Sequence, residues 1–242
     1  MNKLRGTGVA LITPFNSDLS IDYKALEKLI NYQIAGNINY IVLMGTTGES
    51  VVLSNDEKRD IVSFSKKIIK NRVPIVLGVG GNNTLEIVKY IENTDFSGIS
   101  AILSVSPSYN KPTQEGILQH YKIISKSSPV PIILYNVPGR TASNISAETT
   151  LKLANENSNI IGIKEASGDF DQIMKIIKNK PNEFLVISGD DGLTLPMIYL
   201  GAEGVISVIG QLHPVKYSQM VNFAMSADII KANQLHYSLY NY

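Results

Sequence analysis

The 242-residue sequence contains no cysteine, no tryptophan and only three histidines. Without cysteine the chain has no disulfide, no thiolate zinc site and no cysteine nucleophile, and it lacks a common feature of exported proteins. The three histidines are scattered along the chain, at His120, His213 and His236. We therefore expect no metal site.

The sequence also lacks an excess of charge and any long apolar run. Lys and Arg number 22 and Asp and Glu 21, so the net charge of +1 predicts neither a nucleic-acid partner nor a basic binding face. No segment approaches the ~18 apolar residues of a membrane span. Near the start, the run Val9 to Ile12 is too short for a signal peptide and is cut by Thr13-Pro14. These absences predict a cytoplasmic protein without membrane contact.

Short runs rich in Val, Ile and Leu recur about every 25 residues and alternate with longer segments of helical periodicity, the pattern of βα units. We count eight such runs: Val9–Thr13, Tyr40–Met44, Ile75–Gly78, Ile99–Val105, Ile132–Tyr135, Ile160–Lys164, Leu185–Ser188 and Gly204–Val208. Eight strands predict a (β/α)₈ TIM barrel. A doubly wound open sheet is the alternative, but the G-x-G-x-x-G turn expected after its first strand is missing.

The segments between these runs predict the helices. Expected helices span 23–35, 55–70, 84–93, 114–125, 147–155, 171–179 and 193–200, with Ser54 and Glu57 as a capping box for the second. Two more follow at 215–226 and 227–242. We predict that residues 1–210 form the barrel core and its catalytic rim. Residues 211–242 would supply the last barrel helix and the start of a truncated C-terminal helical segment.

Catalytic groups of such barrels lie at the carboxyl ends of the strands. The segments that follow the predicted strands are polar and reactive: Gly45-Thr46-Thr47-Gly48-Glu49-Ser50, Asn82, Ser106-Pro107-Ser108-Tyr109-Asn110, Tyr135-Asn136-Val137-Pro138-Gly139-Arg140, Lys164-Glu165 and Gly189-Asp190-Asp191. Because all of them would share one rim, they can converge on one pocket.

Lys164 is the strongest candidate for catalysis. It directly follows the apolar residues Ile160 to Ile163, and desolvation there would lower the pKa of its amine and leave more neutral nucleophile. Schiff-base chemistry requires such an amine. The structural alternative is a lysine that extends to the barrel rim or pairs with a carboxylate.

The other rim residues have competing structural explanations. Tyr109 and Tyr135 taken singly are more often core or surface tyrosines, although hydroxyl groups beside a lysine can relay protons. Arg140 offers a planar fork for a carboxylate or forms a surface ion pair. Asp190 and Asp191 more often cap a helix than bind a cation.

In these segments the chain closely resembles the dihydrodipicolinate synthase family of the pyruvate-dependent class I aldolases. The motifs that carry the resemblance stand in the family's order: Gly45–Ser50, Tyr109-Asn110-Lys111-Pro112, Tyr135–Thr141, Gly162-Ile163-Lys164-Glu165, Ser188–Asp191 and Gly204–Val208. The resemblance covers nearly the whole chain. The departure that matters most is the chain's end, which comes earlier than in typical members.

The resemblance implies a lysine-biosynthetic enzyme without metal or organic cofactor. Lys164 would condense with pyruvate, and the enamine would attack L-aspartate 4-semialdehyde. Thr46, Tyr135 and Tyr109 would relay protons, with Tyr109 acting in the neighbouring subunit of a homodimer or homotetramer. The remaining implied roles are pyruvate carboxylate binding by Thr47, semialdehyde carboxylate binding by Arg140, and shaping of the pocket by Gly189 and Ile206.

Two alternatives remain at this point. N-acetylneuraminate lyases and 2-keto-3-deoxy sugar acid aldolases share Lys164 and Tyr135 but generally lack Arg140, and a catalytically silent barrel would keep only the scaffold. The resemblance also implies a possible lysine-effector pocket at Ser50, Asn82 and Glu86. There Ser108, Asn55 and Lys58 replace the aromatic residue and the histidines of sensitive members, so we expect weak inhibition.

Overall fold

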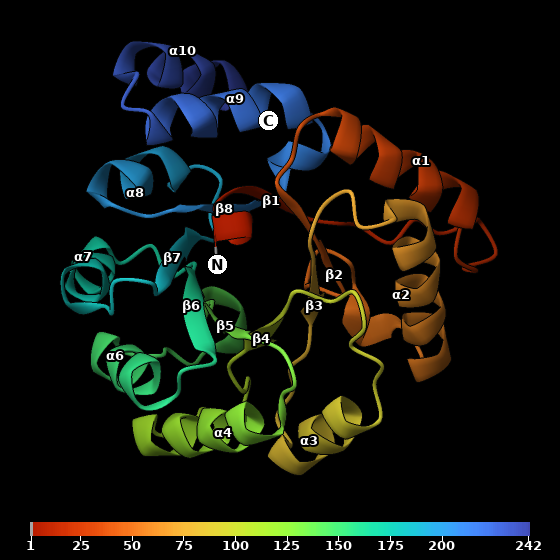
Figure 1. Ribbon diagram of the computed structural model, residues 1–242, viewed down its shortest axis with the longest axis vertical. Coiled ribbons are helices and arrows are strands. Elements are labelled where there is room, and N and C mark those ends of the chain that lie inside the picture. Colours follow the sequence, from red (N-terminus) through yellow and green to blue (C-terminus); the bar gives the residue numbers. More distant parts are fainter. Residues whose placement is uncertain (1) are drawn as a thin grey trace.

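The eight apolar runs form eight parallel strands that close into a barrel in the order β1 to β8 in the computed structural model, which describes residues 2–242 (Figure 1). Closure comes from β1, which pairs with β2 on one side and β8 on the other. The expected TIM barrel is confirmed. The strands are β1 (Gly6–Ala10), β2 (Tyr40–Leu43), β3 (Ile75–Gly78), β4 (Ala101–Val105), β5 (Ile132–Asn136), β6 (Ile160–Glu165), β7 (Leu185–Ser188) and β8 (Gly204–Ser207).

Apart from the short α5, helices surround the barrel in the positions that the periodicity predicts, with ends that differ by at most three residues. They are α1 (Tyr23–Ala35), α2 (Asn55–Ile69), α3 (Thr84–Glu92), α4 (Gln114–Ser127), α5 (Pro138–Thr141), α6 (Ala147–Glu156), α7 (Phe170–Asn179), α8 (Thr194–Leu200), α9 (Pro214–Met225) and α10 (Ile229–Leu239), with 3₁₀ turns η1 (Asn2–Leu4), η2 (Ser50–Val52) and η3 (Ile209–Gln211). The Ser54–Glu57 capping box of α2 is present.

The predicted position of the first strand is wrong by three residues. The strand begins at Gly6 instead of Val9. Its first residues include two glycines, which have no apolar side chain and so do not contribute to the apolar pattern used for the prediction. A Cβ at Gly8 would lie 2.2 Å from the ring of the buried Tyr40, and a Cβ at Gly204 would lie 2.2 Å from the Gly6 carbonyl oxygen. These contacts bring β1 against both neighbouring strands, so the glycine-rich start is strand rather than turn.

Two apolar layers hold the barrel together. Inside it pack side chains such as Tyr40, Val76, Ile133, Leu185 and Ile206, and between the strands and the outer helices lies a larger layer of mainly Ile and Leu. Burying one such side chain contributes roughly 1.5–3 kcal/mol. The chain thus forms a rigid frame under its rim loops.

The C-terminal helices continue the packing around β8. Helix α9 lies between α8 and α1, and α10 packs on α9 (Figure 1). Their shared core includes Tyr217, Met220, Val221, Ala232 and Leu239. The last predicted helix starts two residues late because Asp228 caps it, and it ends at Leu239.

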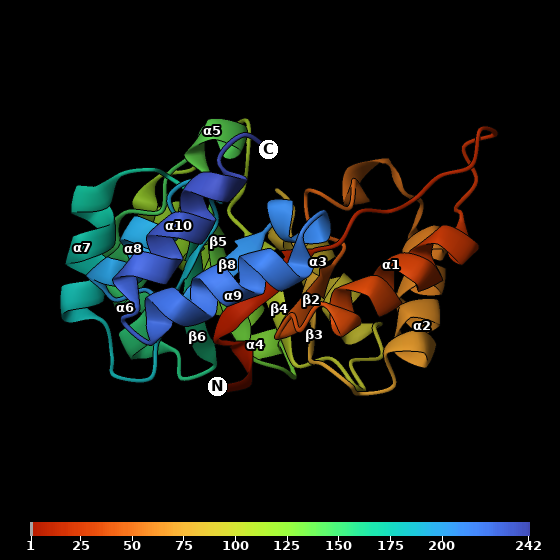
Figure 2. The same cartoon turned by 90° about the horizontal axis from the view of Figure 1, so that it is seen from above.

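The two ends of the barrel carry different structures. Figure 2 shows the N-terminus at one end and α5 at the other, where the strands end. Helix α5 is not among the helices that the periodicity predicts, because four residues are too few to produce a periodic pattern. Within residues 2–242, no helix has both the length and the apolar character needed to cross a membrane.

Candidate active site

Lys164 lies near the end of β6 with 6% of its surface exposed. Parallel pairing sets it beside Tyr135 of β5 and Ile187 of β7. Its Nζ lies 4.3 Å from the centre of the Tyr135 ring. The lysine is therefore a buried side chain against an aromatic face, and the structural alternative of a lysine extended to solvent is excluded.

Burial lowers the pKa of the Lys164 amine to about 8, with the positive charge of Arg140 acting in the same direction and the negative charge of Asp191 opposing it. The expected direction of this shift is present and has the expected cause, desolvation. At pH 7 about a tenth of the amine is therefore neutral and able to attack a carbonyl carbon, far more than in an ordinary lysine.

Tyr135 lies beside the lysine, and Thr46 lines the same cavity as Tyr135. Burial raises the pKa of the Tyr135 hydroxyl, while the nearby Thr46 hydroxyl and the charge of Arg140 offset part of the rise. Tyr135 is buried and Thr46 exposed. The pair therefore joins the interior of the site to its surface, as a proton relay requires.

Arg140 and Tyr109 sit on neighbouring rim segments, but the structure uses them differently. Arg140, in α5, acts on the charges of both Lys164 and Tyr135. Tyr109 has a left-handed backbone (φ 68°), donates its backbone N–H to the Thr141 carbonyl at 3.0 Å, and is 90% exposed. Within one chain, Tyr109 does not join the lysine.

The remaining predicted residues form the walls. A Cβ at Gly189 would lie 2.9 Å from Lys164 Cε and 2.7 Å from the Ala166 Cβ, so only glycine leaves room for the lysine stem. Ile206 is buried in the barrel core. Thr47 is half-buried in a tight turn in which the Gly48 N–H donates to the Gly45 carbonyl at 3.1 Å.

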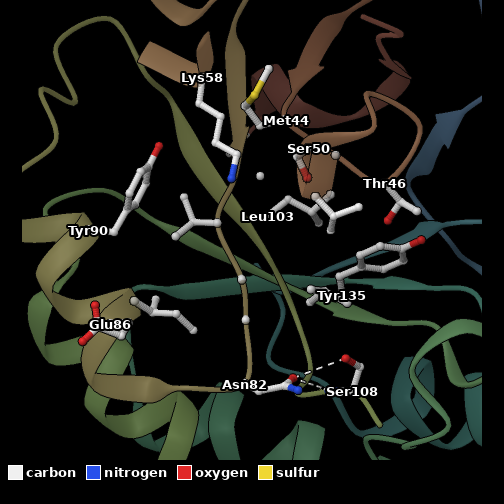
Figure 3. A pocket seen from close by; sticks show the side chains of 18 of the residues that line it. Met44, Thr46, Ser50, Lys58, Asn82, Glu86, Tyr90, Leu103, Ser108 and Tyr135 are labelled. Atoms are coloured by element: carbon white, nitrogen blue, oxygen red, sulfur yellow. Dashed lines mark hydrogen bonds between the residues drawn. The ribbon is translucent and has the colours of Figure 1, made fainter. Parts of the chain in front are cut away.

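Ser50, Asn82 and Glu86 line a cavity of about 500 Å³ that also touches Thr46 and Tyr135 (Figure 3). The carboxamide oxygen of Asn82 accepts hydrogen bonds from the Ser108 backbone N–H at 2.7 Å and hydroxyl at 3.3 Å. Glu86 pairs with Lys89 at 2.9 Å, and the amine of Lys58 points into the cavity. The structure thus brings the three residues together, with the Asn82 oxygen and Glu86 already engaged.

A buried carboxylate that the sequence analysis did not single out lies next to the lysine in sequence. Glu165 is fully buried and accepts hydrogen bonds from Asn136 at 3.1 Å, from Gln172 at 2.9 Å and from the Ser167 backbone N–H at 2.7 Å. Burial raises the pKa of Glu165, and these hydrogen bonds oppose the rise. Glu165 joins β5, β6 and α7 below the rim.

Asp190 and Asp191 differ from the expected pair of helix caps. Asp190 accepts from the Gly192 and Leu193 backbone N–H groups in the turn before α8. Asp191 instead accepts from two backbone N–H groups after β8, so it joins segments far apart in sequence. Within the described residues, no group of three His, Cys, Asp or Glu could hold a metal ion.

Comparison with known proteins adds an independent result. The model of the dihydrodipicolinate synthetase family matches residues 3–241. A 4-hydroxy-tetrahydrodipicolinate synthase of Flavobacterium psychrophilum is 54% identical over 241 residues, which cover 100% of this chain and 82% of that protein.

Solved structures agree with this result. The 4-hydroxy-tetrahydrodipicolinate synthase of Methylacidiphilum fumariolicum is 41% identical with a TM-score of 0.95, covering 98% of this chain and 79% of the other. The chloride-inhibited dihydrodipicolinate synthase of Acinetobacter baumannii, solved in complex with pyruvate, is 39% identical with a TM-score of 0.92, covering 96% and 80%.

Proposed function

The chain belongs to the dihydrodipicolinate synthetase family and is a lyase of the 4-hydroxy-tetrahydrodipicolinate synthase type, and we propose that Lys164 is the amine on which its chemistry takes place. One observation carries this assignment. Lys164 is a buried lysine at the end of a barrel strand whose amine has a pKa of about 8. The tyrosine ring 4.3 Å away completes a site suited to imine formation.

In the proposed reaction the neutral Lys164 Nζ attacks the ketone carbon of pyruvate. The carbonyl oxygen leaves as water, and the pyruvyl group remains bound through a C=N bond. Loss of a proton from the methyl group gives an enamine, whose carbon attacks the aldehyde of L-aspartate 4-semialdehyde. The amino group of the semialdehyde then attacks the imine carbon and displaces the Lys164 amine, which closes the ring and frees the enzyme. The product is a precursor in lysine and diaminopimelate biosynthesis.

We propose that Thr46 and Tyr135 carry the protons of these steps. Both side chains line the same cavity, and the Thr46 hydroxyl acts on the pKa of Tyr135, whose ring lies against the amine. The 90% exposure of Tyr109 fits a residue that completes the relay of a second subunit in a homo-oligomer. The partner's Tyr109 would then supply the outer end of the relay.

Two side chains would hold the substrate carboxylates. Thr47 lies in the turn after β2 and is proposed to hold the pyruvate carboxylate. Arg140 lies in α5 and acts electrostatically on the lysine and Tyr135, so it is placed to receive the semialdehyde carboxylate. Gly189 and Ile206 would set the shape of the pocket around the lysine stem.

Substitution of Lys164 by Arg tests this proposal. A guanidinium stays protonated and cannot form the imine, so Lys164→Arg should abolish the condensation of pyruvate with aspartate semialdehyde. The matched control is Lys175→Arg on α7, where the exposed ion pair with Asp171 can persist. Activity retained by Lys164→Arg would refute the assignment, and wild-type cleavage of N-acetylneuraminate would instead favour an N-acetylneuraminate lyase.

A further inference from the structure

Asp191 holds its carboxylate in an unusual way. Its Oδ2 accepts hydrogen bonds from the backbone N–H groups of Val208 and Ile209, both at 2.9 Å. Its Oδ1 is buried and has no hydrogen-bond partner among residues 2–242. One oxygen therefore fixes the turn after β8. The other is buried without a hydrogen bond, which is unfavourable unless a nearby positive charge stabilises the carboxylate.

The segment that carries Asp191 also packs against the side chain of Lys164. Gly189, two residues earlier, packs so closely on Lys164 that a Cβ there would lie 2.9 Å from Cε. The Tyr217 hydroxyl donates to the backbone carbonyl of Asp191 at 3.2 Å and fixes the segment against α9. The carboxylate is thus held in place relative to the lysine by β7, the turn after β8 and α9.

Each other charged or titratable group near the lysine has a different task. Tyr135 from β5 offers a ring face, and Arg140 from α5 is positive. Asp190 is turned to the backbone of its own loop, and Glu165 is enclosed by amide and backbone donors. Tyr217 stays neutral because burial raises its pKa well above the ordinary value, with Asp191 acting in the same direction.

We propose that Asp191 is a positioning residue whose fixed negative charge balances the iminium formed on Lys164. This inference rests on the proposed function. When the amine condenses with pyruvate, a C–N bond forms and the ketone oxygen leaves as water, with one proton from the nitrogen and one from solvent. A positive charge then remains on the nitrogen. A carboxylate held by two backbone N–H groups stabilises that charge without having to move.

The proposal predicts a pH-dependent defect in Asp191→Asn. The amide oxygen can still accept from the Val208 and Ile209 N–H groups, so the turn is kept and only the charge is lost. Arg140 and burial then act unopposed, and the pH midpoint for trapping with pyruvate and cyanoborohydride should fall from near 8 by about half a unit to one unit.

Pyruvate affinity should change in the same pH-dependent way. At pH 9 the free amine is neutral and the iminium is charged, so loss of Asp191 should raise the apparent dissociation constant of pyruvate about three- to tenfold. At pH 6 ammonium and iminium carry the same charge, and the constant should change less than about twofold. A purely structural defect would weaken binding equally at both pH values.

The experiment measures trapping rates from pH 6 to 9.5 for wild type, Asp191→Asn and the matched control Asp190→Asn, which removes the same charge one residue away. The control should keep the wild-type midpoint. Circular dichroism checks folding, and Asp191→Thr is the second charge-free variant if the first does not fold. Equal midpoints in wild type and the charge-free variant, or equal weakening at pH 6 and pH 9, would overturn the inference. Failure to trap wild type would instead refute the proposed function.

Discussion

Two halves of the same barrel rim differ in how far their charged groups are exposed to solvent. The lysine side, formed by Tyr135, Lys164 and Gly189 at the ends of β5, β6 and β7, is buried or half-buried, and burial displaces the pKa of its amine. The cavity side, formed by Ser50, Asn82, Glu86 and Ser108, is more open, and Glu86 there forms a surface ion pair with Lys89. Thr46 and Tyr135 line the cavity and contact the lysine side.

The difference follows from what each half would do. A nucleophilic amine needs desolvation, because water would stabilise its protonated form. A pocket for a charged effector needs ionic partners that remain free until the effector arrives. Here Ser108 already occupies the Asn82 oxygen, so the cavity side is poorly prepared for a cationic ligand.

Among the substitutions that keep Lys164, the largest expected effect comes from crowding the lysine side. In Gly189→Ala the new methyl group would lie 2.9 Å from Lys164 Cε and force the amine to move. A displacement of this kind costs about 100-fold in kcat. Steady-state kinetics check this, with Gly139→Ala as the matched control because nothing lies within 4 Å of its added Cβ. Equal kcat in both variants would show that the lysine stem tolerates the methyl group.

Removing the positive charge of Arg140 should have a smaller effect than crowding the lysine, and the effect should fall mainly on the second substrate. Arg140→Ala should lower kcat/KM for aspartate semialdehyde by about 30-fold, equivalent to roughly 2 kcal/mol, because a charge-assisted pair with its carboxylate is lost. Imine trapping with pyruvate should survive.

The matched control for this prediction is Arg59→Ala, which removes an exposed pair with Asp56 on α2. Such surface pairs contribute little. Unchanged semialdehyde kinetics in Arg140→Ala would place Arg140 among the surface residues with no substrate role.

The smallest effect concerns the cavity side. Lysine-sensitive family members carry an aromatic residue at the position of Ser108 and a histidine at the position of Lys58. Compared with them, this chain lacks the aromatic contact and adds a like charge, and the two differences should together weaken binding of L-lysine by about tenfold or more. Activity measured against added L-lysine should therefore show half-inhibition well above about 0.1 mM, an affinity of roughly 5–6 kcal/mol. Half-inhibition below that concentration would mean that the cavity binds lysine despite Ser108.

The sequence allowed the barrel and the lysine to be predicted because both depend on local patterns. Apolar runs such as Ile160 to Ile163 form a buried strand. The side chain of the next residue, Lys164, is therefore desolvated at the end of that strand. The error at β1 arose where Gly6 and Gly8 carry no apolar signal, although close packing against Tyr40 requires glycine at Gly8.

The contacts of Asp191 and Glu165 could not be predicted from the sequence, because they depend on partners from distant segments. Asp191 binds backbone N–H groups that follow β8, and Glu165 is enclosed by Asn136 and Gln172 from β5 and α7. Nothing within a few residues of either carboxylate signals these contacts. The proposed role of Tyr109 depends on a second subunit. The apolar periodicity of a single chain does not predict it, and only the family resemblance implies it.

The most direct test of the central claim is reduction with borohydride in the presence of pyruvate, followed by peptide mass mapping. Lys164 is the buried lysine at the end of a strand, with an amine whose pKa is lowered to about 8. We predict one added pyruvyl group, located on the peptide that contains Lys164. Labelling of a different lysine, or no labelling at all, would contradict the account.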